Sequence, residues 1–208
     1  MPKLYLLIGG NQGDRRQMII QATDLIQQRI GSVVACSPIY ETAPWGLFSP
    51  DETPQGFYNQ ALLVETPLSP HIALKEALDI EHQLGRRRKE MENIHTPVFD
   101  QPSKELSFPA TSDVSPQDFP NPSKEGAADA QNSQFYSSRL IDIDLIFYDH
   151  LVVDTPDLIL PHPRMHLRRF VLEPLCSIAP DYIHPIFNKS LTELLDECTD
   201  TSSCTPCC

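Results

Sequence analysis

The sequence contains little glycine, few aromatic residues and no long apolar run. Of its 208 residues, 8 are glycine and 1 is tryptophan, and aromatic residues make up 8%. The longest apolar run is far shorter than the roughly 20 residues that a membrane-spanning helix requires. The N-terminal apolar stretch is too short for a signal peptide and runs straight into Gly9 and Gly10. We therefore expect a cytoplasmic protein with a packed core and no membrane partner.

Positive charge is also scarce. Lys and Arg together number 16 against 28 for Asp and Glu, which gives a net charge of −12. Nucleic acids and anionic membranes would not be attracted to such a chain. We expect no nucleic-acid partner, and we expect the protein to be a monomer or a weak oligomer.

The common phosphate-binding glycine motifs are missing. Neither a Walker A sequence nor Gly-x-Gly-x-x-Gly occurs, and Gly9-Gly10-x-x-Gly13 has neither spacing. If the protein binds a nucleotide, it does so without a P-loop.

Cysteine is concentrated at the end of the chain. Four of the six cysteines lie within residues 198–208, and the body holds only Cys36 and Cys176. This is the pattern of a reduced protein with buried thiols and not of a disulfide framework. The terminal cluster has no second type of metal ligand at a useful spacing, so we predict a flexible tail over 198–208.

Residues 95–138 differ in composition from the rest. They contain six prolines, eight serines and three residues from Ile, Leu and Val. Such a stretch buries too little apolar surface to offset its ordering entropy. We predict a long disordered insertion within a single domain, residues 1–197.

The remaining sequence alternates between two kinds of element. The predicted order is strand, helix, strand, strand, helix, strand, with a further helix later. This order favours an α+β, ferredoxin-like βαββαβ sandwich with an antiparallel sheet. The predicted elements cover about residues 3–8, 14–30, 32–40, 57–66, 69–84, 139–148 and 168–178.

The most informative strand carries two carboxylates. Side chains alternate in a strand, so Asp142 and Asp144 share one face. The other face carries the apolar residues Ile141, Ile143, Leu145 and Phe147. Two carboxylates on a mostly apolar strand repel each other and are costly to desolvate. Magnesium would neutralise them, because it prefers one or two carboxylates together with substrate phosphates. The alternative is a strand end that reaches solvent.

Arginines accompany this pair. Arg86 and Arg88 follow the second helix, Arg139 precedes the aspartates, and Arg164 and Arg168 lie further on, beside His162. Arginine matches phosphate oxygens and keeps its charge, so the combination suggests a magnesium-bridged polyphosphate. The alternative for the run after the helix is a solvated helix end favoured by the macrodipole.

Glu81 lies on the apolar stripe of its own helix, where a carboxylate needs a partner. That partner is either an arginine of the following run or a bound nucleotide.

Taken together, six segments resemble the hydroxymethyl-dihydropterin pyrophosphokinase family of folate biosynthesis. The resemblance covers essentially all of the chain outside the insertion and the tail. In chain order the segments are Leu7-Ile8-Gly9-Gly10-Asn11, Tyr40-x-Thr42-x-Pro44-x-Gly46, Phe57-x-Asn59, Glu81 with Gly85-Arg86-x-Arg88, Arg139-x-x-Asp142-x-Asp144, and Pro161-His162-Pro163-Arg164 with Arg168-x-Phe170.

The resemblance implies an ATP-dependent pyrophosphokinase that acts on a reduced pterin. It implies that Asp142 and Asp144 hold two Mg²⁺ ions and that Arg86 and Arg139 stabilise charge on the transferring group. It also implies which residues contact the two substrates. The nucleotide contacts are Glu81, Arg86, Arg88, Arg139, Leu145, His162 and Arg168; the pterin contacts are Thr42, Ala43, Pro44, Trp45, Phe57, Asn59, Asp142 and Phe170.

The sequence departs from the family before the signature arginine. Tyr136-Ser137-Ser138 stands where the family often has Trp-Gly-Pro, and the segment between Lys89 and Arg139 is much longer than usual. Two other classes share part of the pattern. A metal-dependent nucleotide-sugar transferase would use Asp-x-Asp, and a ferredoxin-like binding module would have the fold without catalysis.

Overall fold

A computed structural model describes residues 1–43, 55–85 and 140–207. These residues lie in one structural unit, which comprises residues 1–86 and 133–208. The predicted insertion over 95–138 falls outside the described residues. So do five predicted site residues, namely Pro44, Trp45, Arg86, Arg88 and Arg139.

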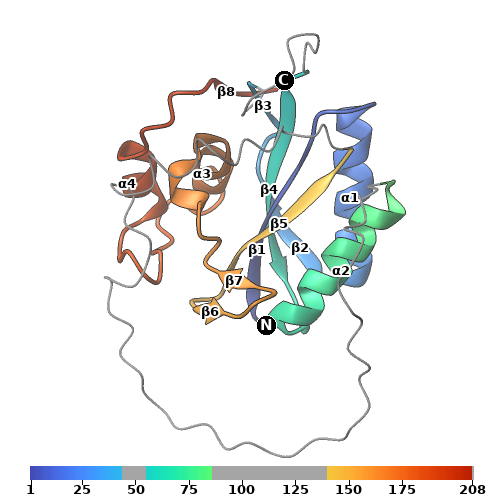
Figure 1. Cartoon of the computed structure of the whole chain (residues 1–208), viewed down its shortest axis with the longest axis horizontal. Helices are drawn as coiled ribbons and strands as arrows, with labels where there is room; N and C mark the ends of the chain where they lie inside the picture. Colours follow the sequence, from blue (N-terminus) through green and yellow to red (C-terminus); the bar gives the residue numbers. More distant parts are fainter. Residues whose placement is uncertain (44–54, 86–139, 208) are drawn as a thin grey trace, which may run out of the picture. The chain divides into compact units, whose positions relative to one another are not determined.

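Six strands of different lengths form one large sheet, and two short strands form a separate ribbon (Figure 1). The strands are β1 (Lys3–Gly10), β2 (Ser32–Cys36), β3 (Tyr40–Thr42), β4 (Phe57–Glu65), β5 (Asp142–Tyr148), β6 (Val153–Asp154), β7 (Ile159–Leu160) and β8 (Cys204–Pro206). The helices are α1 (Arg15–Arg29), α2 (Pro70–Gln83), the 3₁₀ turn η3 (Met165–Leu167), α3 (Arg169–Cys176) and α4 (Leu191–Asp196).

The large sheet is antiparallel throughout. Its strand order is β5-β1-β4-β3-β8, and β2 also pairs with β4. The predicted mixed fold with an antiparallel sheet is therefore confirmed. Helix α1 begins after Asp14, as predicted, because the Asp14 carboxylate accepts a hydrogen bond from Gln17 N at 3.0 Å.

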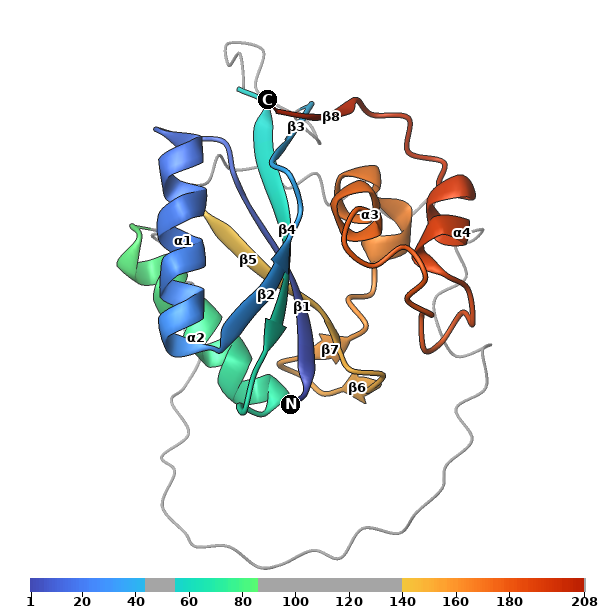
Figure 2. The same cartoon turned by 180° about the vertical axis from the view of Figure 1, so that it is seen from behind.

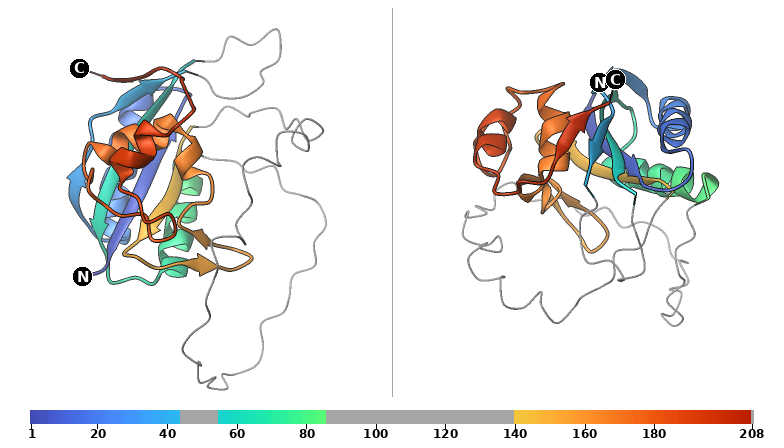
Figure 3. Two further views of the ribbon diagram at one scale, coloured as in Figure 1. Left: turned by 90° about the vertical axis from the view of Figure 1, so that its left-hand side faces the viewer. Right: turned by 90° about the horizontal axis from the view of Figure 1, so that it is seen from above.

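Helices cover both faces of this sheet. Helices α1 and α2 pack on one face, and α3 and α4 lie on the other (Figures 1 and 2). Seen from above, the sheet lies between the two pairs (Figure 3). The alternation of β1 explains the arrangement: Leu4, Leu6 and Ile8 join the α1–α2 core, while Tyr5 and Leu7 join the α3–α4 core.

Strand β5 departs from the simple alternation that the sequence predicts. Leu6 of β1 pairs with Leu145, but the preceding Tyr5 pairs with Phe147, so Ile146 is an extra residue on the β5 side. Such a bulge reverses the faces of the residues beyond it. Phe147 therefore packs in the α3–α4 core, and not with Ile143 and Leu145 as predicted.

The C-terminal segment also differs from the prediction. Instead of a flexible tail, residues 204–206 form β8, which pairs with β3 in the large sheet (Figure 3). Backbone pairing supplies the order that the polar composition does not predict.

The thiols partly follow the prediction. The five described cysteines are free, as expected for a reduced protein. Cys36, however, is exposed, because it lies on β2 near the edge of the sheet. Within the described ranges, no helix has the length and apolar character needed to cross a bilayer.

A buried histidine predicts how stability depends on pH. His184 is 2% exposed, and its Nδ1 accepts hydrogen bonds from Ile186 N and Phe187 N, both at 3.2 Å. Burial, followed by the neighbouring His166, lowers the pKa of His184 to about 4. The unfolded chain, with a pKa near the usual ~6.5, therefore binds a proton that the native state excludes.

We predict that native stability falls as pH decreases from about 6.5 towards 4, because protonation then favours the unfolded chain. In the His184→Asn variant, which retains an acceptor near the same place, the fall in the urea midpoint over this range should be smaller. The measurement is urea unfolding at a series of pH values. Parallel curves for the two proteins would contradict the role given to His184.

Candidate active site

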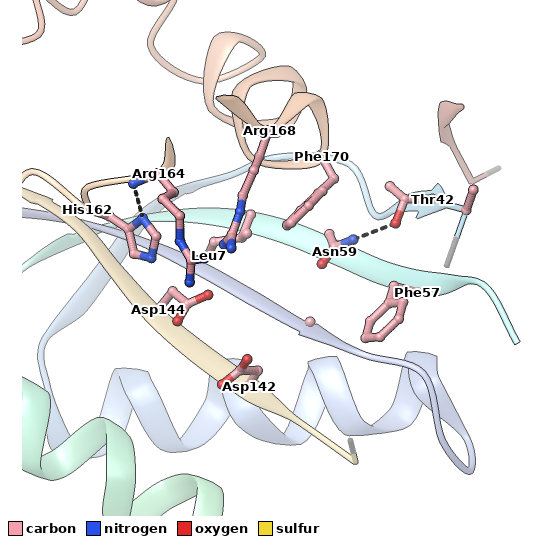
Figure 4. A pocket seen from close by; sticks show the side chains of 12 residues that line it. Leu7, Thr42, Phe57, Asn59, Asp142, Asp144, His162, Arg164, Arg168 and Phe170 are labelled. Carbon is pink, nitrogen blue, oxygen red and sulfur yellow. Dashed lines mark hydrogen bonds between the residues drawn. The ribbon is translucent and has the colours of Figure 1, made fainter. Parts of the chain in front are cut away.

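One pocket opens on the face of the sheet that carries α3 (Figure 4). Its floor comes from four adjacent strands, β5, β1, β4 and β3, and its opposite wall comes from the segment between β7 and α3 together with the first turn of α3. The lining residues are Leu7, Gly9, Thr42, Ala43, Phe57, Asn59, Asp142, Asp144, His162, Arg164, Arg168 and Phe170.

Strand register brings the floor residues together. Gly9 lies between Asp142 of β5 and Asn59 of β4, and Leu7 pairs with Asp144. Because residues two apart on a strand share a face, both carboxylates point to the pocket side. They stand at the start of β5, where the α3–α4 core gives way to the opening.

Asn59 lies across Gly9 and holds the neighbouring strand. It is 5% exposed, and its Nδ2 donates to Thr42 Oγ1 at 2.9 Å. A Cβ atom on Gly9 would lie 2.2 Å from Asn59 Oδ1 and 3.0 Å from Tyr58 O. Glycine at this position is therefore required for the Asn59 amide to occupy the floor.

The opposite wall carries positive charge. Met165 of η3 is fully buried, which anchors the turn between Arg164 and Arg168. In Figure 4 both arginine side chains extend from this wall towards Asp144. The Arg168 guanidinium lies 5.6 Å from the centroid of the Phe170 ring, a distance compatible with a cation–π contact.

His162 lies beside these arginines as a neutral group. Its Nδ1 accepts a hydrogen bond from Arg164 N at 3.3 Å. Burial, and then the charges of Arg168 and Arg164, lower the pKa of His162 to about 4, although Asp142 acts in the opposite direction. Near neutral pH the imidazole adds hydrogen-bonding capacity without adding charge.

Glu81 supports the carboxylate strand from the other side of the sheet. It extends from α2, is 2% exposed, and its Oε1 accepts a hydrogen bond from Ile143 N at 2.7 Å. That amide lies between Asp142 and Asp144. This bond to the β5 backbone is a contact that the sequence did not indicate, and the arginines that it suggested as partners, Arg86 and Arg88, lie outside the described residues.

Most of the predicted site residues that are described meet in the pocket. Those that line it are Thr42, Ala43, Phe57, Asn59, Asp142, Asp144, His162, Arg168 and Phe170. Glu81 and Leu145 do not line the pocket. Glu81 contacts the backbone of β5 from α2, and Leu145 packs in the core below α1 and α2. The predicted substrate contacts did not include three of the lining residues, Leu7, Gly9 and Arg164. The side-chain alternation of β1 and the proximity of Arg164 to His162 were the available signals.

The donor set defines the kind of ligand that fits. Two carboxylates suit a hard cation, and the arginines suit phosphate oxygens. Phe57 and Phe170 offer aromatic faces beside the Asn59 amide. This combination defines a nucleotide-dependent phosphoryl-transfer type of site with room for a flat second ligand.

Comparison with known proteins specifies that class further. The family model of 7,8-dihydro-6-hydroxymethylpterin-pyrophosphokinase matches residues 5–99 and 109–180. A 2-amino-4-hydroxy-6-hydroxymethyldihydropteridine pyrophosphokinase from Porphyromonas gingivalis is 30% identical over 186 residues, 89% of this chain and 95% of that protein. The Folic acid synthesis protein FOL1 of Dictyostelium discoideum is 32% identical over 182 residues, 88% of this chain and 20% of that protein.

Solved structures agree at the level of the fold. The wild-type HPPK-DHPS of Plasmodium falciparum with pteroate aligns with a TM-score of 0.59 at 12% identity, over 94% of this chain and 44% of that one. This chain thus spans less than half of that protein. The chain described here belongs to the 7,8-dihydro-6-hydroxymethylpterin-pyrophosphokinase family. That membership decides against the nucleotide-sugar transferase that Asp-x-Asp alone left open.

We predict that Glu81→Ala destabilises the fold by about 1–3 kcal/mol, because it leaves the buried Ile143 amide without its acceptor. Glu81→Gln keeps an acceptor oxygen and should cost less. Urea unfolding of both variants measures the difference. Equal losses would indicate that packing of the side chain, and not its hydrogen bond, is what matters.

Proposed function

We propose that this chain transfers pyrophosphate from ATP to the hydroxymethyl group of 6-hydroxymethyl-7,8-dihydropterin, with AMP as the second product, in folate biosynthesis. The observation that carries the proposal is the convergence of the Asp142–Asp144 pair, Arg168 and the two phenylalanines on one pocket of a family member. ATP and the reduced pterin are the substrates. The experiment that tests it is incubation with both substrates and Mg²⁺, followed by assay for AMP.

The carboxylate pair fits magnesium. Among the described residues, no group of three or more His, Cys, Asp or Glu side chains could hold a metal ion by itself. A pair of carboxylates whose coordination is completed by water and substrate phosphates is what Mg²⁺ accepts. Asp142 and Asp144 would hold two such ions, which neutralise phosphate charge when bound.

The basic wall faces the triphosphate. Arg168, with Arg164 beside it, supplies guanidinium groups towards Asp144, and neutral His162 donates or accepts a hydrogen bond without repelling the arginines. Arg86, Arg88 and Arg139 keep the roles that the family resemblance implies: Arg88 binds nucleotide, while Arg86 and Arg139 also stabilise charge on the transferring group. Glu81 acts through the β5 backbone in this scheme.

The other end of the pocket accepts the pterin. Phe57 and Phe170 provide faces for a flat ring system. The Asn59 amide, held by Thr42, and the backbone at Thr42 and Ala43 supply hydrogen bonds to the ring edge. Pro44 and Trp45 continue the same contact segment in the sequence.

The chemistry then follows from placement. The hydroxymethyl oxygen attacks the β-phosphorus, the bond to the α-phosphate oxygen breaks, and AMP leaves with that electron pair. The hydroxyl proton passes to Asp144 or to water, and Asp144 also orients the hydroxyl. The arginines stabilise charge that grows in the transition state, which is where an interaction accelerates the reaction.

The same proposal includes the organisation of the chain. Residues 1–197 form one pyrophosphokinase domain interrupted at about 95–138. A ferredoxin-like classification is supported by the order β5-β1-β4, with β2 and β3 together following β4 as one broken strand. A cytoplasmic monomer or weak oligomer is the expected state.

We predict that Asp142→Asn or Asp144→Asn lowers the rate of AMP formation by about 100-fold or more, because a charge that stabilises the bound metal is lost. The fold should survive, since like-charge repulsion is also relieved. Steady-state rates and urea midpoints are the measurements. Asp154→Asn, at an exposed carboxylate of β6, is the matched control. Full activity in either site variant would refute the metal assignment.

We predict that Gly9→Ala weakens pterin use more than ATP use. The new Cβ displaces the Asn59 amide from the floor and breaks its hydrogen bond to Thr42. The pterin KM should rise about tenfold or more, a loss of roughly one hydrogen bond. Gly13→Ala controls for a general effect of losing glycine, because Gly13 lies at a turn with positive φ where a new Cβ would make only an ordinary contact, 3.7 Å from Leu140 Cδ2. Equal KM changes for both substrates would contradict this role of Gly9.

A further inference from the structure

The C-terminal segment, residues 198–207, contacts two different walls of the pocket. One contact is to the start of α3, where Arg168 precedes the helix and Phe170 lies in its first turn. The other is to β3, which carries Thr42 and is followed by Ala43. These walls are far apart in the sequence, and α3 and β8 also contact each other. A single short segment therefore connects both sides of the opening.

The first contact is made by Asp200. Its Oδ2 accepts a hydrogen bond from Arg169 N at 2.9 Å, and its Oδ1 accepts one from Ser202 N at 2.9 Å. Although burial alone would raise the pKa of Asp200, a hydrogen bond from the Ser202 hydroxyl, the two backbone hydrogen bonds and the Arg169 charge hold it below its usual value. Asp200 thus remains a carboxylate.

This contact replaces a missing helix cap. The residue before α3, Arg168, makes no side-chain capping bond of its own. Helix starts leave backbone N–H groups unsatisfied, and an oxygen acceptor there stabilises the first turn. Asp200 supplies that acceptor from 31 residues further along the chain. The residues on either side of Arg169 are the two pocket residues Arg168 and Phe170.

The second contact is the pairing of β8 with β3. Tyr40, Glu41 and Thr42 pair with Pro206, Thr205 and Cys204. The pairing extends at both ends, since Cys207 N donates to Ile39 O at 2.7 Å and Ala43 N donates to Ser203 O at 3.3 Å. Strand β3 has only three residues. Pairing with β8 along its outer edge therefore restricts the backbone movement of Thr42 and Ala43.

The Cys204 thiol of this segment serves packing. Burial, and then Glu173 of α3, raise the pKa of Cys204 to about 12, and burial raises that of Cys176 to about 11. Protonated thiols are poor nucleophiles and poor metal ligands. Cys204 therefore contributes to a structural support, and the contacts of the segment define what it supports.

We propose that residues 198–207 are a positioning segment for pterin binding, in which Asp200 sets the first turn of α3 and β8 sets Thr42 and Ala43. The segment holds the Phe170 wall at a fixed distance from the β3–β4 floor, so the flat ligand meets a preformed slot. Preorganised contacts bind more tightly because ordering is not required on binding. The inference rests on the proposed function for the identity of the ligand.

Two variants separate the two contacts. In the first, the chain ends at Ser202, which removes β8 but keeps Asp200. In the second, Asp200→Ala removes the cap but keeps β8. Each should raise the KM for the hydroxymethyl pterin by about fivefold or more while kcat changes by less than about threefold. Asp200→Asn, which retains one acceptor oxygen, should restore most of the wild-type KM, and Asp181→Ala is a control at an exposed carboxylate.

Hydrogen exchange provides a readout that does not depend on activity. Exchange should quicken at Ala43 in the shortened chain and at Arg169 in Asp200→Ala, while α1 and α2 stay protected. If the wild-type protein forms no AMP, the proposed function fails, but the exchange result still tests whether residues 198–207 hold α3 and β3 in place. Unchanged exchange, or a wild-type pterin KM in both variants, would overturn the inference.

Discussion

The fold depends on burying β1 on both of its faces. Seven of its eight residues, Leu4 to Gly10, are buried. A strand of this kind requires apolar partners above and below the sheet, and short helices are the available ones. Helices α1 and α2 satisfy one face, and α3 and α4 satisfy the other. The C-terminal third of the chain is thus part of the core, and the pocket lies where its coverage of the sheet ends.

The site uses that boundary between covered and open sheet. Asp142 and Asp144 lie on the same face as the buried Ile146, but at the start of β5, where α3 no longer covers them. From the opposite face, Glu81 fixes the backbone amide between them. The carboxylates can therefore stay close to solvent and ligands while the strand that bears them is held from behind. Exposed carboxylates on a mobile loop would lack this fixed spacing.

The charged groups are also arranged around the pocket. The protein is strongly acidic overall, yet arginines gather on the pocket wall opposite the carboxylates. His162 stays neutral between them because it is buried next to two guanidinium groups. Elsewhere, ion pairs such as Arg29 with Glu76, 2.7 Å apart between α1 and α2, are partly exposed and contribute modestly. The stability of the fold comes from its two apolar cores, and charge is concentrated where it serves binding.

The sequence by itself determined the features that have a local period or motif. The Asp14 cap, the helical stripe that ends before Gly31 and the alternation around Asp142 and Asp144 are all readable over a few residues, and the family motifs indicated most of the pocket. Tertiary structure alone decided the rest. The bulge at Ile146, the Glu81 bond to Ile143 and the pairing of β8 with β3 join residues far apart in the chain. Their energies arise only when distant surfaces meet, so no local pattern encodes them.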